Sequence, residues 1–432
     1  TRHRTLRRPR PGQLHPGLGS RIIDNQLYPE FWTQPRDEID RQLAALRSCP
    51  PHFFTETDTA SIGIPTGPGA WAIVDYDHIL HISKNPQIFS PAAGITVLDL
   101  PPEFNEFFSS MIAMDDPRHA RLRRLVSAGF TPRMLARLED AVTIQASEII
   151  GEIADRGECD FVVDVAGRLP LAIVCDLMGV PRSELDFVFD KTNIILGASD
   201  PEYVPEADDI PTALLRAGGE LAALMTSVAE HKKGGDGDDL TSILVNAEVE
   251  GERLTFSEIA SFFILLVVAG NETTRNAISW GLVYLTENPD QRAQWQADFE
   301  EFAPTAVEEI VRLASPVTYM RRTATEATMV GDTSIEAGDK LAMFYLAANR
   351  DGNRFVDPLR FDVGRTPNPH IGFGGPGPHF CLGAHLARRE ITVMFRELFA
   401  TLPDIEATGP PEVLQSSFIH GIKHLPAQYT PA

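Results

Sequence analysis

The chain has 432 residues, 43% of them hydrophobic, and a formal net charge of -22 at pH 7. This length and apolar content suffice for a large buried core. The acidic balance disfavours nucleic acid and anionic membrane surfaces as partners, because binding to either depends on lysine and arginine.

The N-terminal segment is basic, with five arginines among its first ten residues, followed by prolines and glycines. It holds no apolar stretch that could form the core of a signal peptide. We interpret residues 1–19 as a flexible basic tail and residues 20–432 as one domain, because no internal repeat or long linker interrupts the chain. Four scattered cysteines, none in a C-x-x-C pair, favour a reducing cytoplasm over a disulfide framework.

Apolar residues recur at three- and four-residue intervals over most of the chain, which predicts a mainly α protein. Short strand signals and likely turns at Gly331 and Gly338 add small β-sheets. Two acidic stretches, 197–211 and 232–239, predict surface loops. The longest predicted helices are Leu135–Ile153, Leu214–His231, Phe256–Thr286 and Leu382–Leu402, and the strand signals lie in Ala70–Tyr76, Ala327–Leu346 and Ser417–Tyr429.

The helix predicted from Phe256 contains the longest uncharged apolar run, the 13 residues Ile259–Asn271. A membrane span needs about 20 such residues, so we interpret it as a core helix and expect no membrane span. Thr255 and Glu258 have the spacing of a capping box at its start.

The same helix then becomes polar, with Gly270, Asn271, Glu272, Thr273 and Thr274 in succession. Threonine hydroxyls in a helix often bond back to a carbonyl one turn earlier, which needs no function. Placing so many polar groups inside an apolar helix is nevertheless costly, and such local inconsistency is typical of functional sites.

A glycine-rich stretch near the C-terminus allows two interpretations. Gly372, Gly374 and Gly377 spell G-x-G-x-x-G, the pattern of a dinucleotide site, but that site requires a preceding strand and an acid about 20 positions later. The preceding segment contains two prolines, and the next acid, Glu390, follows too soon. We favour a loop that presents Cys381 at the start of a helix, where backbone N–H groups stabilise a thiolate.

This loop resembles the haem-thiolate loop of the cytochrome P450 superfamily, with Gly377, His379, Cys381 and Gly383 at matching positions. Phe373 lies eight residues before Cys381, whereas the family pattern has its aromatic residue seven before. The resemblance implies haem b with Cys381 as its iron ligand, held between a long central helix and the Cys-bearing loop. It also implies a buried structural cluster of Glu309, Arg312 and Arg360, from the family's E-x-x-R and P-x-R-F motifs.

The resemblance assigns roles to the polar break as well, since residues 269–274 match the family's A-G-x-[DE]-T. Ala269 and Gly270 would lie beside the haem, with Gly270 leaving room there. Glu272 and Thr273 would be catalytic, delivering the protons that the activation of O2 consumes. The haem propionates would bind four cationic side chains, two of them at i,i+4 on one helix: His119, Arg123, Arg322 and His379.

The chain shows no flavin or nicotinamide motif, so we expect electrons from a ferredoxin and a ferredoxin reductase. Arginines cluster beside the haem-contacting motifs and predict a basic patch for an acidic ferredoxin: Arg118, Arg121, Arg124, Arg388 and Arg389. Simple solvated arginines are the alternative.

The residues assigned to the substrate pocket by family position are apolar, which indicates a hydrophobic substrate: Leu265, Val268, Ala269, Val317, Phe418 and Ile419. From about Asp24 to Thr430 the chain resembles actinobacterial, particularly mycobacterial, enzymes that hydroxylate methyl-branched fatty acids, isoprenoids and sterol side chains. Two alternatives remain open: a peroxygenase that uses hydrogen peroxide, and a non-catalytic haem-thiolate sensor or lipid-binding protein.

Overall fold

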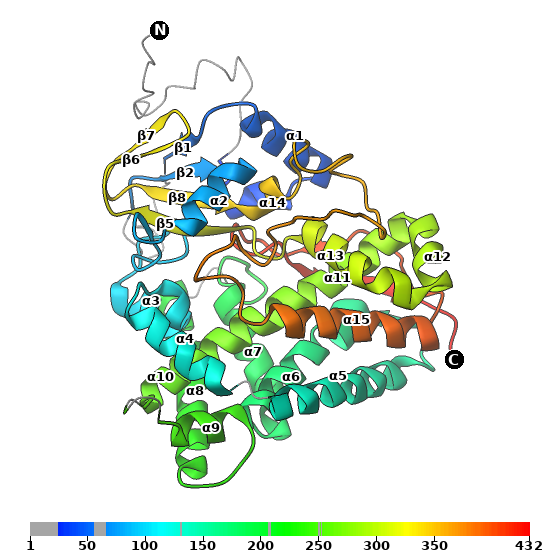
Figure 1. The fold of residues 1–432 in the computed structure, drawn as a ribbon. Coiled ribbons are helices and arrows are strands. Elements are labelled where there is room, and N and C mark those ends of the chain that lie inside the picture. The colour runs from blue at the N-terminus through cyan, green and yellow to red at the C-terminus, as the bar shows by residue number, and fades with distance from the viewer. Residues whose placement is uncertain (1–24, 56–65, 130–131, 206–208, 249–250, 252) are drawn as a thin grey trace.

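The computed structural model describes residues 25–432 except 56–65, 130–131, 206–208, 249–250 and 252. The predicted basic tail, residues 1–19, lies outside the described part. Figure 1 shows a sheet region, with β1, β2, β5 and β8, at one end of the molecule and a larger helical region below it. The expected fold class, mainly α with small β-sheets, is confirmed.

Helices make up most of the described chain, including two π-helical segments, η4 and η6. In chain order they are η1 (Pro29–Thr33), α1 (Arg36–Arg47), α2 (Tyr76–Lys84), α3 (Pro102–Ser109), η3 (Ser110–Ala113), α4 (Arg118–Gly129), α5 (Pro132–Ile153), η4 (Phe161–Ala166), α6 (Arg168–Met178), η5 (Arg182–Glu184), α7 (Leu185–Leu196), α8 (Ile210–Lys232), α9 (Leu240–Asn246), α10 (Phe256–Leu266), η6 (Val267–Asn271), α11 (Glu272–Glu287), α12 (Pro289–Ala297), α13 (Phe299–Ala314), α14 (Tyr345–Ala348) and α15 (Ala384–Thr401).

The strands are short and form small sheets. They are β1 (His52–Phe54), β2 (Ala70–Ile73), β3 (Phe89–Ser90), β4 (Glu158–Asp160), β5 (Tyr319–Ala324), β6 (Thr328–Val330), β7 (Thr333–Ile335), β8 (Lys340–Phe344), β9 (Glu406–Ala407), β10 (Glu412–Val413), β11 (Ile422–His424) and β12 (Pro426–Gln428). The largest sheet has the order β1-β2-β8-β5-β3, and only β2 and β8 run parallel.

The centre of this sheet is buried on both faces. In β8, Ala342 and Phe344 join one apolar cluster, whereas Leu341 and Met343 join the cluster on the opposite face. Alternate side chains of a strand point to opposite faces, so a strand covered on both sides is apolar throughout. The sheet therefore gives β5, which carries the predicted haem contact Arg322, a rigid support.

The central helix runs through the helical region as α10, η6 and α11 without a break (Figure 1). Its start carries the predicted capping box, with both hydrogen bonds between Thr255 and Glu258 present. By length and composition alone, Phe256–Glu287 could cross a membrane, but core helices pass the same test and 56% of its most apolar window is buried. The π-helical turn η6 ends at Asn271, within the polar break, and such turns are frequent at functional sites.

Candidate functional site

The glycine-rich loop leads directly into α15. It follows no strand, so the context that a dinucleotide site requires is missing from this part of the structure. A Cβ on Gly377 would lie 2.4 Å from the carbonyl oxygen of Ser83 in α2, so only glycine allows this close approach. The Cys381 N–H donates a hydrogen bond to the Phe373 carbonyl, 3.1 Å away, which closes the loop just before α15.

The Cys381 side chain is exposed, so a ligand can reach its sulfur. The surrounding protein atoms still desolvate the thiol, which raises the pKa of Cys381. A hydrogen bond from the Gly383 backbone and the charges of Arg123 and Arg388 lower the same pKa and favour the thiolate.

The extra residue between Phe373 and Cys381 does not separate the ring from the loop. Phe373 packs against the main core, and the Arg388 guanidinium lies over its ring, 4.3 Å from the ring centre. Arg388 in turn forms an ion pair with Glu308 of α13, which also contacts His370 at 2.7 Å. The aromatic ring is thus fixed between α15 and α13 beside the cysteine loop.

The four predicted propionate contacts are brought together by three elements. The His119 ring of α4 and the His379 ring of the loop lie 4.1 Å apart. Arg123, one helical turn after His119, donates to the Phe380 carbonyl at 2.9 Å. Burial, and then the charges of Arg322, His119 and Arg123, lower the pKa of His379 to about 3. The mutual influence of these side chains on His379 shows that they share one electrostatic environment.

The central helix places the predicted acid, Glu272, and the predicted alcohol, Thr273, in different surroundings. The Thr273 hydroxyl is half-buried and donates to the Ala269 carbonyl at 2.6 Å, whereas Ala269 itself is exposed between half-buried neighbours. Glu272 is fully buried, forms an ion pair with Arg275 and accepts a hydrogen bond from Asn276 at 2.9 Å. Thr273 and Ala269 therefore face the open side of the helix, and Glu272 is engaged in a buried network.

The predicted pocket residues of the C-terminal turn, Phe418 and Ile419, lie beside the segment with Val317 that follows α13. Val317 and Ile419 form an isolated β-bridge, and the Thr318 N–H donates to the Phe418 carbonyl at 2.9 Å. Val317 and Phe418 are half-buried, whereas Ile419 is buried. Val317 packs against one of the two apolar clusters that cover the main sheet and Phe418 against the other, and Leu265 is buried in the main core.

Comparisons with known proteins decide the family. A model of the cytochrome P450 family matches residues 222–402. The chain is 49% identical over 405 residues to a methyl-branched lipid omega-hydroxylase of Mycobacterium bovis, with 93% of each chain covered. The chain belongs to the cytochrome P450 family.

Two further similarities agree with this assignment. The P450 is 37% identical over 396 residues to a steroid C26-monooxygenase of Mycolicibacterium smegmatis, with 90% of each chain covered. A solved Mycobacterium marinum cytochrome P450 in complex with pseudoionone matches with a TM-score of 0.88 and 40% identity, covering 95% of this chain and 100% of that one. The protein is accordingly a monooxygenase that uses haem b.

The side chains of this P450 fit such a group. Across the described residues, no carboxylate lies within ion-pair distance of Arg123, Arg322 or His379, and the buried Nδ1 of His379 has no hydrogen-bond partner. Arg123 and Arg322 are cations that act on the same imidazole, and cations held together at low dielectric require a counter-charge, which the two haem propionates would provide. Nothing lies within 4 Å of a Cβ built on Gly383, which leaves room for a flat ligand beside Cys381.

The structural cluster differs from the prediction at one position. Glu309 and Arg312 form the expected fully buried pair, with Arg312 Nε 2.7 Å from Glu309 Oε2. The third arginine is Arg365, whose Nε lies 3.0 Å from both carboxylate oxygens, and the Arg360 side chain is exposed. The prediction for Arg360 is wrong because the loop directs that side chain outward and contributes only its carbonyl to the cluster.

Gly270 also has a different role from the predicted one. A Cβ at this position would meet a methyl group of Val174 in α6 at 3.1 Å. The missing side chain therefore permits close packing of η6 on α6, and it does not open space on the side of Ala269. The periodicity of a regular α-helix does not predict which side of the helix residue 270 faces, because the π-helical turn rotates this residue.

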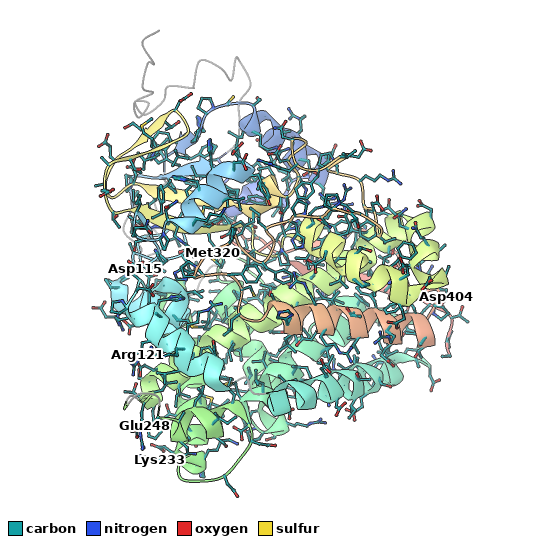
Figure 2. The ribbon with its side chains drawn as sticks, viewed as in Figure 1. Asp115, Arg121, Lys233, Glu248, Met320 and Asp404 are labelled. Carbon is teal, nitrogen blue, oxygen red and sulfur yellow. The ribbon has the colours of Figure 1, made fainter. Side chains whose placement is uncertain are left out.

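The predicted basic patch is partly neutralised. Arg118 and Arg121 turn toward α3 and α10, where they pair with Glu106 at 2.6 Å and Glu258 at 2.7 Å; Figure 2 labels Arg121 on α4. Arg388 pairs with a carboxylate of α13, as described above. The other two arginines of the predicted patch differ in exposure: Arg124 is exposed and Arg389 is half-buried.

Sequence reasoning missed Arg275, which extends the buried network beyond the central helix. Its Nη1 donates to Asn193 of α7 at 3.0 Å, and its guanidinium lies over the Phe189 ring. Arg275 directly follows the catalytic motif, and nothing in the neighbouring sequence indicates that its partner is 82 positions away. The acid of the motif is thus connected to α7.

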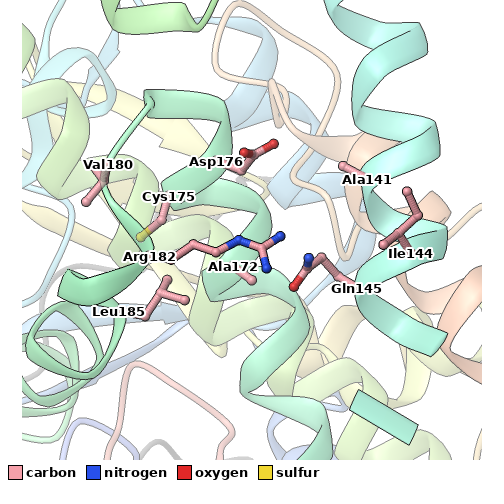
Figure 3. Close-up of a pocket in the computed structure, with 9 residues that line it drawn as sticks. All are labelled: Ala141, Ile144, Gln145, Ala172, Cys175, Asp176, Val180, Arg182 and Leu185. Carbon is pink, nitrogen blue, oxygen red and sulfur yellow. The ribbon is translucent and has the colours of Figure 1, made fainter. Parts of the chain in front are cut away.

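A separate cavity of about 140 Å³ lies between α5, α6 and the turn before α7 (Figure 3). Cys175 and Arg182 line it together with apolar residues of both helices. Burial raises the pKa of the Cys175 thiol to about 12, so this cysteine is unreactive. None of the predicted site residues contributes to this cavity.

Proposed function

We propose that this P450 hydroxylates a terminal methyl carbon of a methyl-branched lipid, with sterol side chains as the second substrate class. The observation that carries the proposal is the 49% identity, over 93% of both chains, to an enzyme named methyl-branched lipid omega-hydroxylase. The identity to the steroid C26-monooxygenase is lower, at 37%. Both names describe attack near the end of a branched hydrocarbon, which supports a common mode of binding.

The apolar lining supports recognition of the substrate by shape. Val317 and Phe418 are half-buried apolar side chains and Ile419 is buried, and backbone contacts between the two segments fix their positions. A site with few polar groups gains most of its binding free energy from burying the substrate chain. Branch methyl groups fill space that a linear chain leaves empty, so we expect preference for branched over linear lipids.

Haem, when bound through Cys381, supplies the activation of O2, aided by the electron donation of the thiolate. The chain itself supplies protons and holds water in place. Because the Thr273 hydroxyl donates to the Ala269 carbonyl, its oxygen lone pairs remain available to accept a hydrogen bond from a proton donor. Glu272 is the nearest acid on the helix, and we propose that it supplies this position with protons.

We further propose that a ferredoxin and its reductase supply the electrons, in the cytoplasm. Arg124 is exposed on α4 directly after Arg123, whose guanidinium contacts the Phe380 carbonyl of the cysteine loop, and we assign it to the docking face. Arg124→Glu should slow ferredoxin-supported turnover without changing lipid affinity, and Arg41→Glu on the exposed face of α1 is the matched control. Equal turnover of both variants and the native enzyme would argue against this docking face, and full turnover with hydrogen peroxide alone would argue against ferredoxin dependence.

The substrate proposal is tested with three lipids. Phytanic acid is branched, palmitic acid is linear, and cholestenone carries a sterol side chain. We expect phytanic acid to shift the ferric spin state at the lowest concentration and to yield a terminal alcohol, identified by mass spectrometry. Tighter binding of palmitic acid, or hydroxylation within the chain, would contradict the proposal.

A further inference from the structure

The loop that follows α7 is tied to the C-terminal strand β11 by charged side chains. The Lys423 ammonium of β11 lies 3.2 Å from Asp200 and 2.7 Å from Glu202, both in this loop. It also lies 3.0 Å from Glu412 of β10. Asp200 additionally accepts a hydrogen bond from the Gln415 N–H at 3.0 Å. The loop is therefore attached to β11 through Lys423 and to Gln415, which follows β10.

His424 forms the second half of this attachment. Its Nδ1 lies 2.5 Å from Asp160 of β4, and its Nε2 lies 3.1 Å from Glu202. Glu202 thus bridges Lys423 and His424, with one oxygen directed to each. We call Asp160, Asp200, Glu202, Lys423 and His424 the latch.

The latch holds more negative than positive charge. Together with Glu412, its carboxylates face the Lys423 ammonium and the His424 imidazole. Lys423 is almost buried, with 10% of its side chain exposed, whereas His424 is 40% exposed and can exchange a proton with solvent. When the imidazole is neutral, Lys423 is the single latch cation facing these carboxylates, and their repulsion weakens the attachment.

The attached loop is next to the catalytic helix. It continues from α7, whose Asn193 binds Arg275, the ion-pair partner of Glu272. Within the loop, the Asp200 N–H bonds to the Gly197 carbonyl, and the Val204 N–H bonds to the Asp200 carbonyl. Movement of this loop therefore moves the end of the helix that packs on η6.

We propose that the latch holds residues 197–204 against β11 and opens at alkaline pH, which speeds the exchange of lipid at the site. The lipid part of this inference rests on the proposed function. The movement of the loop with pH does not rest on the proposed function, because it follows from the contacts within the chain.

The direction of the pH effect follows from the partners of His424. Burial opposes protonation, but the hydrogen bonds to Asp160 and Glu202 outweigh it and raise the pKa of His424. A raised pKa means that the stabilisation is complete below the ordinary histidine pKa of about 6.5 and is lost as the pH rises through the higher, folded-state value. Of the other charged groups near β4, Glu158 belongs to the strand itself, and Asp164 and Arg156 pair with each other at 3.5 Å.

The first test is hydrogen–deuterium exchange of the holoenzyme, corrected for the intrinsic pH dependence of exchange. Measurements are made about one pH unit below and about two above the ordinary histidine pKa of about 6.5. We expect exchange in 197–204 to rise about two- to fivefold at the higher pH, the range for partly exposed ion pairs. His424→Gln and Glu202→Gln should show the fast exchange at both pH values, whereas His81→Gln on the exposed end of α2 should behave as the native enzyme.

The second test measures the dissociation rate of phytanic acid by stopped-flow detection of the spin state. The dissociation rate of phytanic acid from the native enzyme should increase about two- to fivefold from the lower to the higher pH. From His424→Gln, phytanic acid should dissociate rapidly at both pH values. Slow exchange of 197–204 in His424→Gln at the lower pH would overturn the latch, whatever the lipid does. If exchange responds and phytanic acid does not bind, the latch stands and the lipid proposal fails.

Discussion

Glu309 of α13 binds Arg365, which lies 56 positions later in the chain, through both carboxylate oxygens at 3.0 Å. The same carboxylate binds Arg312 on its own helix and the Asn368 amide at 3.1 Å. This single acid therefore fixes the irregular segment that leads to the cysteine loop onto α13. The position of Cys381 relative to the helical region depends on it.

Replacing Arg365 should be far more damaging than replacing Arg360. Arg365→Leu leaves part of the buried Glu309 charge uncompensated, and breaking a buried ion pair costs about 3–5 kcal/mol. Arg360→Leu changes an exposed side chain and should alter the free energy of unfolding by about 0.5 kcal/mol or less. Urea unfolding of the two variant holoproteins measures both changes in the free energy of unfolding. Equal losses of stability would show that Arg360 contributes to the buried cluster as much as Arg365.

Gly377→Ala should destabilise the haem loop. The added Cβ would lie 2.4 Å from the Ser83 carbonyl, so either the loop or α2 must shift. Gly352→Ala is the matched control, because a Cβ there has nothing within 4 Å and should be neutral or stabilising. Haem retention on gel filtration and the melting temperature distinguish the variants; a Gly377→Ala protein that keeps its haem and melting temperature would show that the loop tolerates the shift.

Thr273→Ala should uncouple electron consumption from product formation. Loss of a group that positions protons typically lowers the rate of the chemical step by about a hundredfold or more. NADH oxidation should continue, with product per NADH greatly reduced, and Thr273→Ser should restore coupling because the hydroxyl returns. Undiminished coupling in Thr273→Ala would assign the hydroxyl to its bond with the Ala269 carbonyl alone.

Cys381→Ala should remove the thiolate signature without unfolding the protein. In the native enzyme, reduced and exposed to carbon monoxide, we expect the strongly red-shifted Soret band of thiolate ligation. The variant should lack this band, with its circular dichroism unchanged. A native spectrum of the kind given by histidine ligation would contradict the role of Cys381.

Acid should weaken the contact between α13 and α15 at Glu308. Burial opposes its ionisation, but hydrogen bonds from Arg388 and His370 more than offset this and lower the pKa of Glu308 to about 2. A depressed acid pKa contributes stability above the ordinary value of about 4.3 and loses it as the pH falls toward the folded-state value. The urea midpoint of the native protein should therefore drop between about pH 5 and about pH 3 by more than that of Glu308→Gln. An equal drop in the urea midpoint of the two proteins would show that Glu308 does not contribute to the loss of stability in acid.

The sequence predicted the features that residues near one another in the chain specify. Helical periodicity located the central helix, and the spacing of Thr255 and Glu258 predicted a capping box that is present. The buried pair of Glu309 and Arg312 followed from the family resemblance of the E-x-x-R motif, because its spacing alone is common in helices. The cysteine loop was recognisable because glycines and Cys381 lie within a few residues.

Tertiary structure alone decided the contacts between distant segments. Arg360 and Arg365 stand in the same irregular loop, and no local pattern indicates which of them turns inward to Glu309. The arginines of α4 look like a free basic patch until α3 and α10 bring Glu106 and Glu258 against them. Lys423 meets Asp200 across 223 positions for the same reason. Sequence patterns report which face of an element is apolar, whereas the partner of a charged side chain depends on which elements the packed core places beside it.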